Sequence, residues 1–308
     1  MLRNATTLKE LASDPLLLEL DNAPSASDPF RIAVLSVGLA RTLLHPRVAA
    51  SFRLMLSSIR TQQRAFFSLW SERAAQLQAG IRCAYGGVVT AVWLRSNELA
   101  CNARCAAARC AQTSKAGPFN LVRQVAKWRV AYGDLLSWQR SRRLAAEWIV
   151  KVRPDLLWLE PLPLTFLRDG AAVYVPRGVM SRRPTEQRHN DHVFACPLRC
   201  PRCAIPLCAP YFSSIAQHWE ACRGSLRKED MLDQAYPGET LRFIEVAYTV
   251  ARDDGPQCMR LPCGNSSWHT GCVAPNLVRF HSSCVELAKS WSTGVGQDAC
   301  VTWGRTRL

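Results

Sequence analysis

The stretch from residue 148 to residue 158, WIVKVRPDLLW, constrains the fold of this chain more than any other part of it. Its first five residues are mostly β-branched or aromatic, which favours a buried strand. Pro154 has no N–H to donate to a ladder, so the strand is predicted to end near this proline. We therefore expect an α/β sheet that contains this strand.

Three charged residues stand where the strand ends, namely Lys151, Arg153 and Asp155. Ligands of α/β sheets usually bind beyond the strand ends. Because side chains alternate along a strand, the three are predicted to share one face. Buried charges are costly unless they are paired, and a complex of a divalent cation with a diphosphate would pair all three. A local ion pair between Arg153 and Asp155 explains the same residues, and the stretch alone leaves both interpretations open.

The N-terminal half of the chain predicts a βαβ arrangement. Apolar runs at 31–37, 65–70 and 88–94 are expected to be strands. A helix is expected after His45-Pro46, because apolar residues recur there at three- and four-residue spacing. Strand, helix and strand in this order indicate a parallel sheet.

The clearest helix is predicted over residues 120–143, directly before the 148–158 stretch. Its apolar residues form one stripe, which we interpret as core rather than as a cofactor-binding surface. The stripe consists of Leu121, Val125, Trp128, Tyr132 and Leu135.

The remaining segments are less regular. The pattern predicts strands at 171–175 and 193–196, a polar loop at 177–189, a helix at 209–222 and a strand at 243–250. Residues 1–29 are expected to form a short helix and then coil. Residues beyond 255 are rich in Cys, Gly and Ser and predict no regular element.

Several segments taken together resemble one family. They are RIAVLSVGLAR at 31–41, Q-x-x-K-W at 124–128, W-x-V-K-V-R-P-D-L-L-W at 148–158, N-D-H-V-F at 190–194 and A-P-Y-F at 209–212. In this order they resemble the uncharacterised GT-A-type glycosyltransferase-like proteins of algae and protists, which are distantly similar to WavE-like polysaccharide-synthesis proteins. The resemblance implies an α/β fold with a GT-A-like nucleotide-sugar-binding sheet flanked by helices, and a Cys-rich C-terminal extension.

This resemblance also implies an organisation and an activity. A polar segment at 1–29 is expected to precede a glycosyltransferase-like α/β domain at 30–254, followed by a Cys/Gly/Ser-rich tail at 255–308. The implied reaction moves a sugar from a nucleotide-sugar donor to a hydroxyl of a glycan or protein acceptor, assisted by Mn²⁺ or Mg²⁺.

Individual residues receive roles from the same resemblance. Asp155 matches the carboxylate that faces the divalent cation, and hard oxygen ligands suit Mn²⁺ and Mg²⁺. The chain lacks a plain D-x-D motif, which leaves its use of a metal open. Asp191 is expected to orient the acceptor or to take its proton, although an Asx-turn explains the segment equally. The expected donor-binding residues are Lys151, Arg153, Asp155 and Asn190, and the expected catalytic residues are Asp191 and His192.

Cysteine supports a second interpretation, because the chain has 14 of them. Cys200, Cys203, His218 and Cys222 have the form C-x2-C-x14-H-x3-C, which is close to the spacing of Zn²⁺ ligands. On this interpretation the chain is a non-catalytic basic binding module held by Zn²⁺. Disulfides formed in an oxidising compartment, or buried free thiols, explain the same cysteines, so the three states stay open.

The net charge of +15 favours a phosphate-bearing partner. The arginines are spread along the chain rather than gathered in runs, so nucleic-acid binding is not expected. No apolar run reaches the roughly 18 residues of a membrane span, and the first 30 residues do not predict a signal peptide. The residues leave the cellular location unknown, and only the resemblance implies the Golgi or the secretory pathway.

Overall fold

The computed structural model describes thirteen parts of the chain. They are residues 15–20, 31–40, 42–59, 63–71, 74–96, 118–176, 192–198, 206–214, 232, 235–236, 240–246, 248–252 and 255–257.

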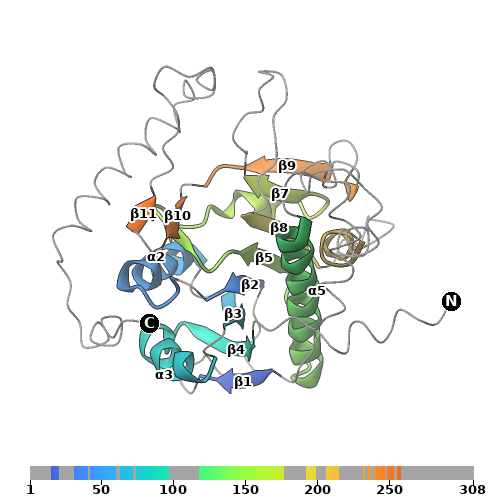
Figure 1. The fold of residues 1–308 in the computed structure, drawn as a ribbon. Coiled ribbons are helices and arrows are strands. Elements are labelled where there is room, and N and C mark those ends of the chain that lie inside the picture. Colours follow the sequence, from blue (N-terminus) through green and yellow to red (C-terminus); the bar gives the residue numbers. More distant parts are fainter. Residues whose placement is uncertain are drawn as a thin grey trace.

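An eight-stranded sheet forms the centre of the molecule, with strand order β1-β4-β3-β2-β5-β8-β7-β9 (Figure 1). Its strands are β1 (Leu16–Glu19), β2 (Ile32–Leu39), β3 (Gln63–Trp70), β4 (Val89–Arg95), β5 (Trp148–Val152), β7 (Val173–Pro176), β8 (Val193–Pro197) and β9 (Leu241–Ile244). A second sheet of three strands joins β6 (Leu156–Trp158), β10 (Tyr248–Arg252) and β11 (Gly255–Gln257).

The strands β4, β3, β2 and β5 are parallel neighbours, as the predicted βαβ pattern requires. Helices α2 (Pro46–Leu56), extended by a 3₁₀ turn (Ser57–Ile59), and α3 (Ala74–Tyr85) connect β2 to β3 and β3 to β4. Helix α5 (Pro118–Ser141) lies between β4 and β5 in the chain. Figure 1 shows α2 and α3 on one face of the sheet and α5 on the other. The parallel strands are nearly continuous apolar runs because both of their faces are buried.

Each face of the sheet has its own core. The core beneath α2 and α3 includes the rings of Phe52, Phe67 and Tyr85, whose centroids lie 4.8–5.8 Å apart. The core beneath α5 includes Trp128 and Phe194. The interpretation of the α5 stripe as core is confirmed for Val125, Trp128 and Leu135, which are all buried.

Several details differ from the prediction. Residues 16–19 form a strand rather than helix or coil, because Leu18 completes the core while the strand pairs with β4. The strand predicted over 243–250 is two strands, since β9 ends at Ile244 and pairs with β7, whereas β10 pairs with β6. The described part of the helix predicted over 209–222 is a single π-helical turn at Pro210–Ser214.

The fold prediction is confirmed in its coarse form, an α/β sheet flanked by helices. The Cys-rich extension lies almost wholly outside the described residues. Among the helices that the structure describes, none has the length and apolarity that crossing a bilayer would require.

Candidate functional site

A topological switch point lies between β2 and β5. From β2 the chain winds outward through β3 to β4, and it then returns to β5 on the other side of β2. The connections that leave β2 and enter β5 therefore cover opposite faces of the sheet (Figure 1). In open α/β sheets a ligand crevice forms beyond the carboxyl ends of the strands at such a point. The Arg153-Pro154-Asp155 sequence follows β5 at this edge.

Gly38 and Pro154 bring the two strand ends together. A Cβ atom placed on Gly38 would lie 3.0 Å from Cδ of Pro154, and Gly38 has a φ of +154°. Glycine alone combines this backbone conformation with so close an approach. Strand β5 ends at Val152, two residues before the proline, as predicted. The contact fixes Asp155 at the end of β2.

Arg153 and Asp155 form an ion pair with two hydrogen bonds. Arg153 Nε donates to Asp155 Oδ1 at 2.8 Å, and Nη2 donates to Oδ2 at 2.6 Å. Asp155 is 7% exposed, so the pair is largely removed from water. Such forked pairs are strong and directional. The local ion pair, one of the two interpretations of the sequence, is therefore present in the structure.

Lys151 lies apart from this pair, beneath aromatic rings. Its side chain is fully buried, and its Nζ lies 4.3 Å from the ring centroid of Trp128 and 5.8 Å from that of Tyr211. These are cation–π distances. Because β5 ends at Val152, the alternation that predicted a shared face does not extend to Arg153 and Asp155. No signal in the sequence predicted the contact between Lys151 and Trp128.

His192 reaches the same edge from the neighbouring strand. Strand β8 runs antiparallel to β5 with Val193 opposite Val152, so residue 192 follows opposite residue 153. The His192 ring lies 5.8 Å from the Tyr248 ring, and that ring lies 5.7 Å from Trp158. The fold thus brings His192 to the edge that holds Asp155. Asn190 and Asp191 lie outside the described residues.

A second polar cluster, which sequence reasoning missed, lies between α5 and the ends of β3 and β4. Arg95 Nη2 donates to Asp134 Oδ1 at 2.7 Å, and Nη1 donates to Ser68 Oγ at 3.3 Å. Arg95 and Lys127 both lie against the Trp70 ring, at 5.4 and 5.1 Å from its centroid. Burial raises the pKa of Asp134, against the opposing effects of Arg95 and Ser68. This cluster ties α5 to the carboxyl ends of β3 and β4.

His45 caps helix α2 in the loop that follows β2. Its Nδ1 accepts a hydrogen bond from the Arg47 N–H at 3.3 Å, which satisfies one of the unpaired donors of the first helical turn. Burial, with a further contribution from Arg47, lowers the pKa of His45 to about 4. The imidazole at this edge is therefore neutral near pH 7.

The metal assignments depend on few described residues. Within the described ranges, no three His, Cys, Asp or Glu side chains come together as a metal-holding group. Asp155 offers one hard carboxylate to Mn²⁺ or Mg²⁺, which keep few protein ligands where phosphates and waters complete their shell. Its donor chemistry therefore fits these ions, with Arg153 as its present partner. The four residues of the Zn²⁺ interpretation, Cys200, Cys203, His218 and Cys222, lie outside the described residues.

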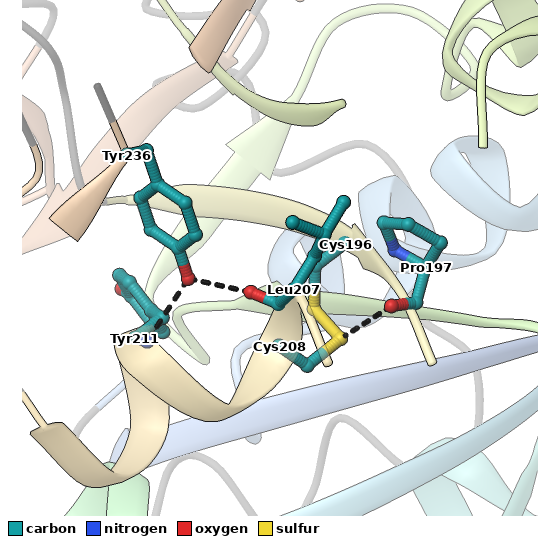
Figure 2. Close-up of a disulfide and its surroundings, with 6 residues drawn as sticks. All are labelled: Cys196, Pro197, Leu207, Cys208, Tyr211 and Tyr236. Carbon is teal, nitrogen blue, oxygen red and sulfur yellow. Dashed lines mark hydrogen bonds between the residues drawn. A yellow bond between two sulfur atoms is a disulfide. The ribbon is translucent and has the colours of Figure 1, made fainter. Parts of the chain in front are cut away.

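Two other cysteines of the same region are joined to each other. Cys196 of β8 and Cys208 form a disulfide, and both are fully buried (Figure 2). Of the three states that the sequence leaves open, this pair adopts the disulfide.

No protein-family model and no curated protein matches the chain. Solved structures are similar to it at low identity. The glycosyltransferase GlyE of Streptococcus pneumoniae is 11% identical, with a TM-score of 0.35 over 71% of this chain and 46% of GlyE. The mannosyltransferase Ktr4p of S. cerevisiae is 12% identical, with a TM-score of 0.44 over 79% of this chain and 77% of that one. The mannosyltransferase PcManGT of Pyrobaculum calidifontis, solved with GDP-Man and Mn²⁺, is 10% identical, with a TM-score of 0.34 over 97% and 84%.

These similar structures are glycosyltransferases, as the sequence resemblance implies. This chain spans about half the length of GlyE. All three TM-scores lie below 0.5, so an activity has to be inferred from the site itself. The similarity to WavE-like proteins stays a prediction.

Proposed function

We propose that the chain is a glycosyltransferase that moves a sugar from a nucleotide-sugar donor to an acceptor hydroxyl. The observation that supports this most is the largely buried Arg153–Asp155 pair at the switch point of a doubly wound sheet. A carboxylate and a forked cation at such an edge suit a metal-bound diphosphate, since the carboxylate binds the cation and the guanidinium binds phosphate oxygens.

In this proposal the ion pair forms the donor site. Arg153 donates a hydrogen bond to each carboxylate oxygen of Asp155. Asp155 would hold the divalent cation through a carboxylate oxygen, and the Arg153 guanidinium would bind the diphosphate. The divalent cation supplies charge neutralisation at the leaving diphosphate. Lys151 acts from beneath as a buried positive charge, and Asn190 is assigned to the donor as well.

The acceptor is assigned to the side of the edge where β8 begins. His192 lies there beside Tyr248, opposite the residue that precedes Pro154. We assign Asp191 and His192 to the acceptor hydroxyl, with Asp191 removing its proton and His192 orienting it. His192 directly precedes the amino end of β8, whereas Asp155 follows the carboxyl end of β5.

A thermal-shift titration with UDP and GDP, with and without Mn²⁺, tests this function. Nucleotide bound to the native state raises the melting temperature by mass action. We expect a Mn²⁺-dependent rise in the wild type that is lost in Asp155→Asn. Glu147→Gln is the matched control, because it removes a carboxylate from the exposed Arg31–Glu147 pair just before β5. A folded wild type whose melting temperature responds to neither nucleotide contradicts the proposal.

A further inference from the structure

Three aromatic rings, here named the aromatic clamp, lie beside Lys151, and two of them, Trp128 and Tyr211, lie at cation–π distance from its Nζ. They belong to Trp128 of α5, Phe194 of β8 and Tyr211 of the segment 206–214. Tyr211 lies between the other two, with centroids 4.9 Å from Trp128 and 3.7 Å from Phe194, and both pairs are stacked. Lys151 is fully buried under this arrangement. Trp128 and Phe194 sit on elements of the main fold, so Tyr211 is the ring whose position depends on a separate segment.

That segment is anchored at two points, which Figure 2 shows together. Tyr236 accepts a hydrogen bond from the Tyr211 N–H at 2.9 Å and donates its hydroxyl proton to the Leu207 carbonyl at 2.7 Å. Burial raises the pKa of Tyr236, so the phenol keeps this proton. The second anchor is covalent, because Cys208 is joined to Cys196 on β8.

The disulfide lies beside the clamp in the strand register. On β8, Cys196 is two residues from Phe194, and the two pair with Ile149 and Lys151 of β5. Alternation along the strand puts Cys196 and Phe194 on one face. The covalent link therefore holds the start of the 206–214 segment against the strand that supplies one ring of the clamp.

We propose that the Cys196–Cys208 disulfide positions Tyr211 on Lys151 and so fixes a buried positive charge beneath the donor site. Lys151 is two residues before Arg153, about 7 Å along the backbone at strand rise. A charge held in a medium of low dielectric acts over that distance on an anion at the edge. Tyr211 and the disulfide are positioning residues, since they act through Lys151. This inference rests on the proposed donor site.

The first test compares nucleotide affinity across variants by the Mn²⁺-dependent thermal shift. Cys196→Ala/Cys208→Ala and Tyr211→Leu are each expected to weaken UDP or GDP binding about tenfold, because a desolvated cation–π contact of this size is lost. Tyr211→Phe is expected to restore most of the affinity, since the contact needs the ring and not the hydroxyl. If Tyr211 had only a structural role, Tyr211→Leu and Tyr211→Phe proteins of equal melting temperature would bind the nucleotide with equal affinity.

Cys83→Ser is the matched control for loss of a disulfide. Cys83 is disulfide-bonded, but it is exposed on α3, which covers the opposite face of the sheet from α5. Its substitution is expected to leave nucleotide affinity unchanged.

A second readout does not depend on nucleotide. Acetylation of native protein, followed by peptide mass spectrometry, reports whether the Lys151 ammonium is shielded. We expect Lys151 to stay unmodified in the wild type, Cys83→Ser and Tyr211→Phe. It is expected to become modified at least about tenfold faster in the double cysteine variant and in Tyr211→Leu.

The outcomes separate the two proposals. A wild type without any nucleotide response overturns the proposed function, and the positioning role falls with it. A wild type that binds nucleotide, together with variants that match it in affinity or in Lys151 acetylation, overturns the positioning role alone. Should the double cysteine variant fail to fold, the comparison of Tyr211→Leu with Tyr211→Phe decides the positioning role by the same two measurements.

Discussion

His45 is a residue whose charge state is set by its surroundings. It lies half-buried in the loop between β2 and α2 and accepts the hydrogen bond that caps the helix. Burial and the nearby Arg47 both disfavour its protonated form, and its pKa falls from 6.5 to about 4. The neutral ring keeps its Nδ1 lone pair available to the Arg47 N–H.

The lowered pKa of His45 makes stability depend on pH in a defined window. Below about pH 6.5 the unfolded chain binds a proton on His45 that the folded chain does not bind until about pH 4. His45 therefore has no effect on the free energy of unfolding above about pH 6.5. As the pH falls from about 6.5 to about 4, it lowers that free energy progressively. We expect His45→Asn, which keeps a capping acceptor, to lose less stability than the wild type between pH 7 and pH 5. Melting temperatures at several pH values measure this, and parallel curves for the two proteins would disprove it.

Among the elements, helix α5 is tied to the sheet by a buried ion pair. The Arg95 and Asp134 side chains are 1% and 15% exposed. Because burial raises the pKa of Asp134 despite the adjacent guanidinium, the cost of dehydrating the carboxylate outweighs the attraction between the two groups. Such a pair contributes little net stability, yet removing one partner leaves the other buried without its counter-charge.

Removing one partner or both should therefore have very different effects. Asp134→Leu leaves Arg95 buried without its carboxylate and is expected to lower the free energy of unfolding by about 3 kcal/mol. Arg95→Met combined with Asp134→Leu is expected to recover most of this loss. Urea unfolding of the two single variants and the double variant gives the coupling energy. Additive single and double effects would show that the groups do not interact.

An element can be predicted from the sequence when its pattern is local, and not when it depends on contacts between distant segments. Strand β5 ends where Pro154 requires it, and α5 shows its stripe at helical spacing, so both were predictable. Helix α3 was not predicted, because Gly80 interrupts a short and weakly apolar segment. In the structure Gly80 packs closely against the Leu44 side chain. The contacts of Lys151 were also beyond prediction, since Trp128 and Tyr211 come from segments far apart in the chain. The meeting of β5 and β8 that brings His192 to Asp155 is likewise a property of pairing rather than of either segment.

At the scale of the whole molecule, a mixed sheet with a buried parallel centre is combined with covalent cross-links. Cys196–Cys208 is internal to the fold, and Cys83 is also disulfide-bonded. Disulfides form and persist in oxidising compartments. The location in the secretory pathway, which the resemblance implies, stays a prediction.

The internal disulfide should also contribute to global stability. It closes a loop between residues separated by 12 positions, and a loop of that size is worth about 3 kcal/mol in the chain-entropy treatment. We expect Cys196→Ala/Cys208→Ala to reduce the free energy of unfolding by about 2–3 kcal/mol, measured in urea against oxidised wild type. Equal unfolding midpoints and slopes would mean that the link constrains nothing in the unfolded chain.

The contact between Gly38 and Pro154 limits how such a chain can diverge. One residue lies at the end of β2 and the other follows β5, more than a hundred positions later, yet the pyrrolidine ring occupies the space that any side chain at residue 38 would need. A substitution at either position therefore affects which residues the other can accept. A side chain at residue 38 would press on the proline ring and would also be strained by the backbone conformation there. This glycine and proline should therefore be inherited together.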